Sequence, residues 1–495
     1  MKKSIGTILF LSLVFTSGTF AAQNYAWTRS VVNTGLEFSM QAICAGEQEL
    51  CVAGHSAELN YRLGDPGLFD GSGTSLMSEY EISRAGDLLF VYGFDGELRW
   101  HYYFDTDEAE LEGITYDVNN QLVALVYQHG LDAGDDEEDD GENADENDIY
   151  HPAKRRPEDL AGYCLYYFNT TGSIVKNRVL TGLHGIDVTD FKSHPSGGFV
   201  IAGHAQNDTV SVHPLLVPGK GGGDLVVFVS AKDSVAWGDM ISYDKETCCT
   251  FGADPKIAVD EKGNVFLGGS YMHGARFGGK FMRLAPIPYN PGAYYEAEET
   301  YVAAYSPEGK FLWVNTAGTQ SWFTGIAAAG GYVYIGTSAS RTETLYDHSV
   351  DTADHEHVFI TVFDAKGKFR RNLSTGAGSK ILLSTDAKGN LVATGTIGIE
   401  TGYLKRPASD DKTKRRLEDC FVAFYSPGGT FQKCLLTDLV KIPSSDPPVC
   451  LAAGPGEIFM IANITGGMSL TLHMLDNAFP NLEFAMGASF VARWK

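Results

Sequence analysis

A hairpin pattern that recurs along almost the whole chain is the feature that most constrains the fold. Its clearest copy runs from Lys256 to Ser270 and reads KIAVDEKGNVFLGGS, with two apolar segments flanking a polar turn that contains Gly263. Such a pattern is typical of a β-hairpin. Six further copies begin at Ala42, Gly113, Val188, Gly325, Ile381 and Val449. Seven copies predict a chain that is built from repeated antiparallel units.

A second hairpin follows each of the first six copies, most clearly TYVAAYSPEGKFLWVN from Thr300. Four short strands per copy predict an all-β fold, a seven-bladed β-propeller with four antiparallel strands in each blade. The seventh copy ends after one further strand, Ser489 to Trp494, while YAWTRSVV from Tyr25 has no hairpin partner. We expect this N-terminal strand to join the C-terminal blade and close the ring, which would remove exposed sheet edges. One tryptophan column, four residues after the turn, contains Trp27, Trp100, Trp237 and Trp313.

The two hairpins of the fourth copy also carry a family resemblance. KIAVDEKGNVFLGGS together with YVAAYSPEGKFLW (Tyr301–Trp313) resembles the bacterial seven-bladed β-propeller repeat (SBBP) family, and is more distantly similar to NHL-type propellers. Phe277-Gly278-Gly279 and Pro291-Gly292-Ala293-Tyr294 fit the spacer of such repeats. The resemblance covers most of the chain and implies a propeller in an exported or surface protein. It implies no catalytic residue, because members are mostly without an assigned reaction.

Residues 1–21 predict a secretory signal peptide, which leaves 22–495 as a single propeller domain. Lys2 and Lys3 precede the short apolar segment IGTILFLSLVF, and Thr19-Phe20-Ala21 offers small residues for cleavage. A membrane anchor is the alternative, although the apolar run is short for a membrane span. No later stretch is long and apolar enough to cross a bilayer, so we expect no transmembrane segment after signal removal. The expected location is the periplasm, the cell surface or the extracellular space.

The charge of the chain bears on its partners. The net charge is −24, and removing the two signal lysines makes it −26, which argues against nucleic acid and anionic lipid as ligands. Residues 132–148 hold eleven acidic side chains and no basic one. We interpret this segment as a solvated spacer or a diffuse cation binder. Calcium is the candidate cofactor, although Asn147 stands where an EF-hand loop from Asp136 needs a glutamate.

The eight cysteines lie after the signal segment, where an oxidising compartment permits disulfides. Cys44 and Cys51 flank one predicted hairpin turn, and Cys420 and Cys434 flank another, so each pair is a disulfide candidate. The pairing of the others stays open; they are Cys164, Cys248, Cys249 and Cys450.

Long connections between the second and third strands of each blade predict a recognition surface on one face of the propeller. Exposed aromatic rings there would stack on sugars or anchor a protein partner. The alternative is a local core that holds the loops in place. The candidate binding residues are Trp322, Phe323, Tyr289, Tyr294 and Tyr295, with Trp322 the best exposed candidate.

Polar residues end the second strands on the same face, among them His55 and His204. Both are further binding candidates, and paired histidines also suit acid–base chemistry. In the fifth copy His355 and His357 alternate along the chain, and with Asp351 they form a weak candidate metal site, with ordinary surface histidines as the alternative.

These patterns together favour an exported binding module that recognises a glycan or an envelope or extracellular protein. The alternative is a secreted polysaccharide lyase or hydrolase with its site above the central channel. No nucleophile elbow and no phosphate-binding loop occurs in the sequence, so we assign no catalytic residue and favour a role without catalysis.

Overall fold

The computed structural model describes the strands and the tight turns between them. The described residues are 25–32, 38–56, 86–105, 109–129, 162–180, 183, 186–205, 209–212, 215–218, 222–232, 234–243, 253–272, 274–283, 298–319, 321–339, 343–346, 348–350, 357–377, 380–386, 388–397, 418–442, 450–454, 457–464, 468–470, 482–484 and 488–494. The predicted signal peptide and the acidic segment at 132–148 lie outside them. Within the described segments, no helix has the length and apolar character that a membrane crossing requires.

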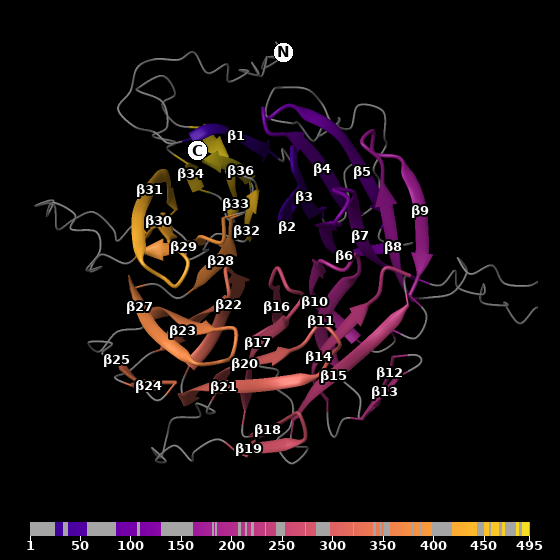
Figure 1. The fold of residues 1–495 in the computed structure, drawn as a ribbon. Helices are drawn as coiled ribbons and strands as arrows, with labels where there is room; N and C mark the ends of the chain where they lie inside the picture. Colours follow the sequence, from indigo (N-terminus) through magenta and orange to yellow (C-terminus); the bar gives the residue numbers. More distant parts are fainter. Residues whose placement is uncertain are drawn as a thin grey trace, which may run out of the picture.

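All described elements are strands, and their sheets form a β-propeller around a common centre (Figure 1). Six sheets contain four antiparallel strands each, as the repeats predict. The sheet that begins with β10 (Ile186–Ser193) differs, because the hairpin of β18 (Gly274–Phe277) and β19 (Lys280–Arg283) extends it to six strands. The expectation of seven equal four-stranded sheets was therefore wrong for this sheet.

Four strand positions repeat from the centre of the propeller outward. The innermost strands are β2 (Phe38–Ala45), β6 (Ala109–Tyr116), β10, β16 (Lys256–Val259), β22 (Ser321–Ala329), β28 (Ile381–Thr385) and β32 (Cys450–Gly454). The second strands are β3 (Glu49–Ser56), β7 (Leu122–Gln128), β11 (Phe199–Ala205), β17 (Val265–Met272), β23 (Tyr332–Ala339), β29 (Leu391–Ile397) and β33 (Glu457–Ile464). The third strands are β4 (Gly86–Gly93), β8 (Gly162–Phe168), β14 (Gly223–Val229), β20 (Glu298–Tyr305), β26 (His357–Asp364), β30 (Glu418–Tyr425) and β36 (Ala488–Trp494).

The outer strands are β5 (Leu98–Asp105), β9 (Ile174–Val179), β15 (Val235–Tyr243), β21 (Phe311–Thr319), β27 (Phe369–Ala377), β31 (Phe431–Ile442) and β1 (Tyr25–Val32). Three small separate hairpins complete the described fold, namely β12 (Thr209–Val212) with β13 (Leu215–Pro218), β24 (Glu343–Leu345) with β25 (His348–Val350), and β34 (Met468–Leu470) with β35 (Leu482–Phe484). The N-terminal strand β1 pairs antiparallel with β36 near the end of the chain.

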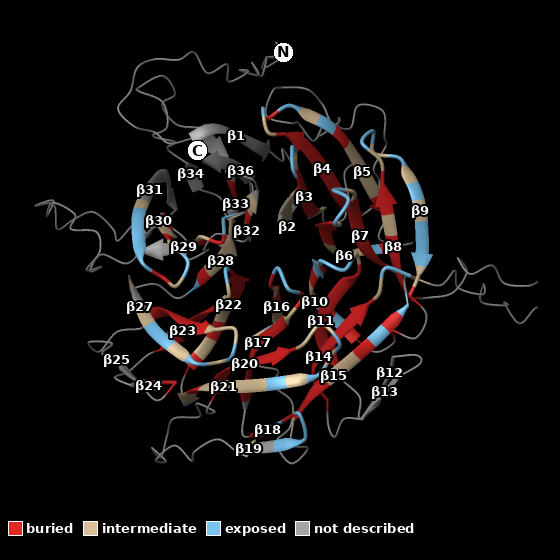
Figure 2. Cartoon of the chain, in the orientation of Figure 1, coloured by how far each residue is buried: buried red, intermediate tan, exposed pale blue. Residues whose placement is uncertain are grey.

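The core lies between neighbouring sheets. Buried residues concentrate in the middle strands, whereas the outer strands alternate between buried and exposed positions (Figure 2). One cluster joins Val226 of β14 to Leu267 of β17, and the next joins Phe266 of β17 to Ile335 of β23. Such faces pack because alternate residues of a strand point to opposite sides of the sheet.

One recurring device closes the tight turns. Asp260 starts the turn after β16, and its Oδ1 accepts the backbone N–H groups of Lys262 at 2.9 Å and Asn264 at 2.8 Å. Gly263 follows with a φ of 81°, a left-handed conformation that glycine adopts without a steric cost. Asp364 and Asp386 begin later turns in the same way. This device is the structural reason for the Asp-x-Lys-Gly pattern of the repeats.

Two tryptophans of the column connect neighbouring sheets. Trp237 on β15 donates its indole N–H to the carbonyl oxygen of Pro307, 3.0 Å away, in the turn between β20 and β21. Trp313 on β21 donates in the same way to Ala365 in the following sheet, at 3.1 Å. In both cases the ring lies against the turn glycine, and a Cβ atom at Gly309 would lie 2.4 Å from Cγ of Trp237. The regular tryptophan spacing therefore encodes contacts between sheets.

Candidate functional site

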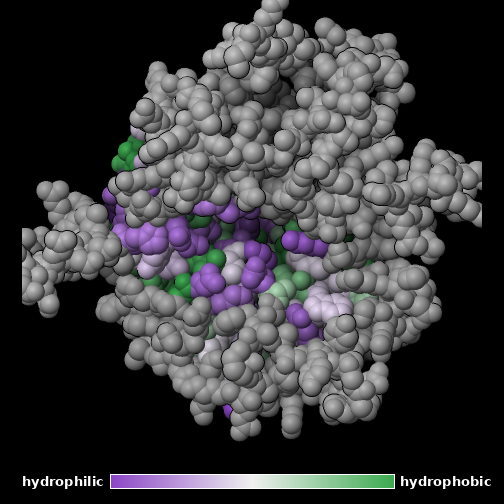
Figure 3. Space-filling view, turned by 180° about the vertical axis from the view of Figure 1, so that it is seen from behind, coloured by the Kyte–Doolittle hydropathy of each residue, from purple (hydrophilic) through white to green (hydrophobic). Residues whose placement is uncertain are grey.

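A cavity of about 740 Å³ lies at the centre of the described strands. Residues from the innermost strand of every sheet line it, from Gln41 on β2 to Leu451 on β32. Each inner strand contacts the next around the centre, and β32 contacts β2. In the view of Figure 3, hydrophilic described residues gather near the middle of the molecule.

β-Bulges place polar residues near the middle of four inner strands. In each of these strands the register skips one residue, and the skipped residue lines the cavity. These residues are Gln41, Glu112, Thr189 and Thr324. The inner strands begin at the end of the channel where the second strands end and the long connections start, and we call this end the channel mouth. Bulges often reorient side chains beside functional sites.

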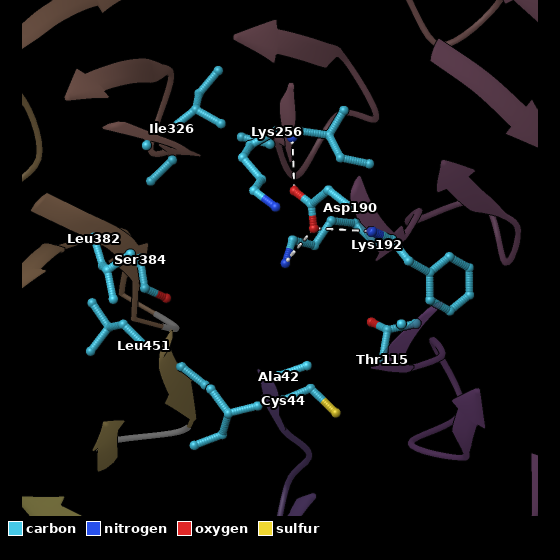
Figure 4. Close-up of a pocket in the computed structure, with 18 of the residues that line it drawn as sticks. Ala42, Cys44, Thr115, Asp190, Lys192, Lys256, Ile326, Leu382, Ser384 and Leu451 are labelled. Carbon is cyan, nitrogen blue, oxygen red and sulfur yellow. Dashed lines mark hydrogen bonds and ion pairs between the residues drawn. The ribbon is translucent and has the colours of Figure 1, made fainter. Parts of the chain in front are cut away.

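Acidic and basic residues line the cavity in equal numbers. Three acidic and three basic residues line it, namely Glu112, Asp190, Asp254, Lys192, Lys256 and Lys380. Asp190 forms an ion pair with Lys192 at 3.2 Å and accepts the backbone N–H of Ile257 at 2.9 Å. The Lys256 ammonium donates to the carbonyl oxygen of Thr189. Figure 4 shows Asp190, Lys192 and Lys256 together on one wall, with Leu382, Ser384 and Leu451 on another.

A buried polar chain links the interior to the mouth. Asp224 on β14 is fully buried, and its Oδ1 lies 3.0 Å from Nδ1 of His204 on β11. The hydroxyl of Tyr301 on β20 donates to Oδ2 of the same carboxylate. On the other side, Nε2 of His204 lies 3.4 Å from Oδ1 of Asp254, which lines the cavity and has a side chain 68 % exposed. The chain therefore joins two neighbouring sheets from core to channel.

The two aspartates decide the protonation of this histidine. Burial alone lowers the pKa of His204, but hydrogen bonds and charge–charge attraction from Asp224 and Asp254 raise that pKa to about 9. The hydrogen bond with His204 lowers the pKa of Asp254, with help from the charges of Lys256 and Lys380. At neutral pH the site therefore holds an imidazolium between two carboxylates.

Stability is expected to fall as pH rises through the pKa of His204. Because that pKa lies above its ordinary value of 6.5, the stabilisation is complete below about pH 6.5 and disappears as pH passes about 9. Solvent screens the interaction between His204 and the exposed Asp254, so the free energy of unfolding should decrease by only about 2 kcal/mol. Urea unfolding from pH 6 to 9.5 measures it.

The His204→Gln variant should no longer show the decrease in the free energy of unfolding that occurs between pH 7.5 and 9.5. Burial, followed by the charges of Glu110, Asp187 and Asp87, raises the pKa of Glu112 to about 7, so its titration belongs to the part below pH 7.5. An unchanged profile in His204→Gln above pH 7.5 would contradict the assignment to His204.

His55 forms the equivalent pair in the first sheet. Its Nδ1 lies 2.8 Å from Oδ1 of Asp87, which is buried and also accepts the backbone N–H of Leu111 on β6 at 2.6 Å. Unlike His204, His55 keeps about a third of its side chain exposed. The two candidate histidines thus occupy matching positions in sheets that are not neighbours, and the structure does not bring them together.

The aromatic candidates have different outcomes. Phe323 is 5 % exposed and packs in the core between β17 and β23, so the expectation of an exposed stacking ring was wrong for it. Trp322 is half-buried, lies on β22 rather than in a loop, and donates a hydrogen bond to the Glu298 carboxylate. Tyr271, near the end of β17, and Phe277, on β18, are buried, as the local-core alternative predicts. Tyr289, Tyr294 and Tyr295 lie outside the described residues.

The metal candidates are mostly beyond the described segments. Asp351 and His355 lie outside them, as does the candidate calcium segment, and His357 is described only as a backbone position on β26. Among the described residues, no group of three His, Cys, Asp or Glu side chains is arranged to hold a metal ion.

The cysteine pairs do not form disulfides. Cys44 and Cys51 are register partners on β2 and β3, but both are free thiols. Cys420 lies opposite Thr437, whereas Cys434 lies opposite Ala423. The three-residue offset separates Cys420 and Cys434 by about 10 Å along the strands, beyond the reach of a disulfide. The expectation that they face each other was therefore wrong.

Sequence reasoning missed most of the polar chain and the cavity charges. Asp224 follows a run of three glycines, and the last of them, Gly223, begins β14. A Cβ atom at Gly223 would lie 2.0 Å from the carbonyl oxygen of Ile241, which explains the glycine. The usable signal was that Asp224 follows this run directly and starts an apolar strand, opposite His204 in the register.

Comparisons with known proteins give a fold-level likeness only. No family model and no curated protein matches the sequence, so the resemblance to SBBP and NHL-type repeats stays a prediction. Among solved structures, the chain is similar to a protein of unknown function from Dyadobacter fermentans at 10 % identity, with a TM-score of 0.37 and 82 % of this chain and 97 % of that one covered.

Two oxygenases are similar at the same level. The Pseudomonas brassicacearum lignostilbene dioxygenase shares 10 % identity at a TM-score of 0.38, over 95 % of this chain and 97 % of that one. The Synechocystis apocarotenoid oxygenase shares 8 % identity at 0.35, over 94 % and 92 %. At these values the likenesses say nothing about the activity of this chain.

Proposed function

We propose that the protein is an exported binding module that takes a glycan or protein ligand at the channel mouth. The observation that carries the proposal is the cavity of about 740 Å³, because every sheet contributes its innermost strand to it. A site that is assembled from all the sheets is held rigidly, and rigid placement of polar groups favours affinity. Export rests on the predicted signal peptide in residues 1–21.

We also propose that the ring has seven blades and is closed by the pairing of β1 with β36. The first four strands of the six-stranded sheet follow the same inside-to-outside order as the other six sheets. The contacts among the inner strands, including β32 with β2, support a continuous ring.

A polysaccharide lyase or hydrolase is the second candidate, favoured by one observation. The buried Asp87 orients the partly exposed His55, an arrangement that suits a general base. Within the described segments, no hydrogen bond or ion pair connects this pair to Asp254 or to the cavity lysines. Binding therefore has the broader support.

Blocking the cavity is expected to abolish binding. The hydroxyl of Ser384 points into the cavity (Figure 4), so Ser384→Trp would fill space that a ligand needs. The purified protein should retain partners from a glycan panel or an envelope extract, and Ser384→Trp should weaken that retention at least about tenfold. Array binding and pull-down measure this.

Lys388→Trp is the matched control, because Lys388 is exposed in the turn that follows the same strand and does not line the cavity. It should bind like the unmodified protein. Partners that Ser384→Trp retains in full would place recognition elsewhere, and the absence of any partner would contradict a binding role.

A further inference from the structure

We infer that Asp254 is the principal hydrogen-bond acceptor for the ligand, that His204 positions it, and that the ligand is a neutral, hydroxyl-rich glycan. This inference rests on the proposed function and narrows it to one ligand class.

The first step is the position of Asp254. It lies two residues before β16 at the channel mouth and lines the cavity. Its side chain is 68 % exposed although it contacts His204. A carboxylate has two oxygens with about four acceptor sites, so the contact through Oδ1 leaves capacity for hydroxyl donors. Hydrogen bonds to an ionised acceptor are about twice as strong as neutral ones.

The second step is the role of His204. The imidazole is 4 % exposed, so it does not present itself to a ligand of any size. Its Nδ1 is fixed by Asp224, and Asp224 is fixed in turn by Tyr301, which leaves Nε2 directed at Asp254. His204 is therefore a positioning residue that limits the freedom of an otherwise exposed carboxylate.

The third step concerns charge. Each acidic group of this wall already has a basic neighbour, because Asp190 pairs with Lys192 and Asp254 with His204. Acidic and basic residues are equal in number around the cavity, although the whole chain carries −24. A charged ligand would have to compete with these internal ion pairs. A hydroxyl group can both donate and accept a hydrogen bond, so it can bind to the basic and to the acidic side chains of the cavity.

The fourth step is the opposite wall. Ile326, Leu382 and Leu451 contribute aliphatic groups to the cavity, on the side away from Lys192 (Figure 4). Sugars carry hydroxyl groups at the ring edge and C–H groups on the ring face, so one polar and one aliphatic wall suit them. Small-molecule sites commonly combine apolar surface with a few placed polar groups.

The experiment compares neutral oligosaccharides, namely β-glucan, mannan and xylan fragments, with anionic polygalacturonate and alginate fragments. A neutral fragment should bind with an affinity that changes less than about twofold between 0.05 and 0.5 M NaCl. Asp254→Asn should weaken it at least about tenfold, the effect expected for losing a charged acceptor. Asp95→Asn, an exposed aspartate that pairs with Arg99 outside the cavity, should leave it unchanged.

A double-mutant cycle with His204→Gln and Asp254→Asn tests the role of His204. If His204→Gln merely destabilised the protein, it would weaken binding whether or not Asp254 is present. His204→Gln should weaken binding about fivefold alone, and have almost no further effect when Asp254→Asn is already present. Equal effects of His204→Gln in both backgrounds would overturn the positioning role.

The outcomes separate this inference from the proposed function. Preferential binding of the anionic fragments with strong salt dependence, or full binding by Asp254→Asn, would overturn the inference. A partner that is not a neutral glycan, but is lost in Ser384→Trp, would also overturn it while the proposed function stands. If nothing binds, both fail.

Discussion

Replacing Asp224 with alanine is expected to lower the free energy of unfolding by about 3–5 kcal/mol. The carboxylate is fully buried and accepts hydrogen bonds from His204 and Tyr301. Removing it leaves an imidazolium and the buried hydroxyl group of Tyr301 without their acceptor. Breaking a buried charge pair from one side costs more than the pair contributes, because the remaining charge stays desolvated.

Equilibrium unfolding in urea at pH 7 measures this loss. Asp224→Asn, which keeps the shape and part of the hydrogen bonding, should lose less than the alanine variant. Asp95→Ala is the control, since the exposed pair of Asp95 with Arg99 is expected to contribute less than about 1 kcal/mol. If Asp224→Ala and Asp95→Ala lost the same amount, the buried chain would have no special role in stability.

Gly309→Ala is expected to destabilise the protein by about 3–5 kcal/mol. A left-handed φ of 80° costs a non-glycine residue about 1–2 kcal/mol. The new Cβ would also lie 2.4 Å from Cγ and 2.8 Å from Cβ of Trp237, the base of a side chain that its hydrogen bond to Pro307 holds in place. Forcing such a contact adds about 2–3 kcal/mol.

Gly331→Ala provides the matched control. Gly331 has nearly the same φ, 78°, but nothing lies within 4 Å of its added Cβ. It should therefore show only the backbone cost, and the difference between the two variants measures the contact with the tryptophan. Thermal and urea unfolding both report it, and equal losses would show that the tryptophan ring moves aside freely.

The repeat made the fold predictable from the sequence. The Asp-x-Lys-Gly turns have a local cause, visible in Asp260 and Gly263, so the hairpins could be located without coordinates. The tryptophan column also had a structural basis, in contacts between sheets. The added strands β18 and β19 were not predictable, because pairing with β15 depends on a long connection reaching a neighbouring sheet.

The candidate site was predicted much less well. His55 and His204 were recognised from their place at strand ends, but their partners depend on register and on packing between sheets. Asp254 contacts His204 although the two are 50 residues apart in the sequence and belong to different sheets. A sequence motif with fixed spacing cannot predict such a contact. Phe323 shows the opposite error, since an aromatic residue near a loop was taken as exposed while it belongs to an inner strand and the core.

The hairpin of β18 and β19 has a consequence for how such a molecule can change by duplication and loss of its units. This hairpin follows β17 in the chain but covers the outer strand β15 of the preceding sheet. Deleting the repeat that contains β16 and β17 would also uncover that neighbour. Recombination would therefore have to exchange the sheet that contains β15 and the sheet that contains β17 together to keep both intact.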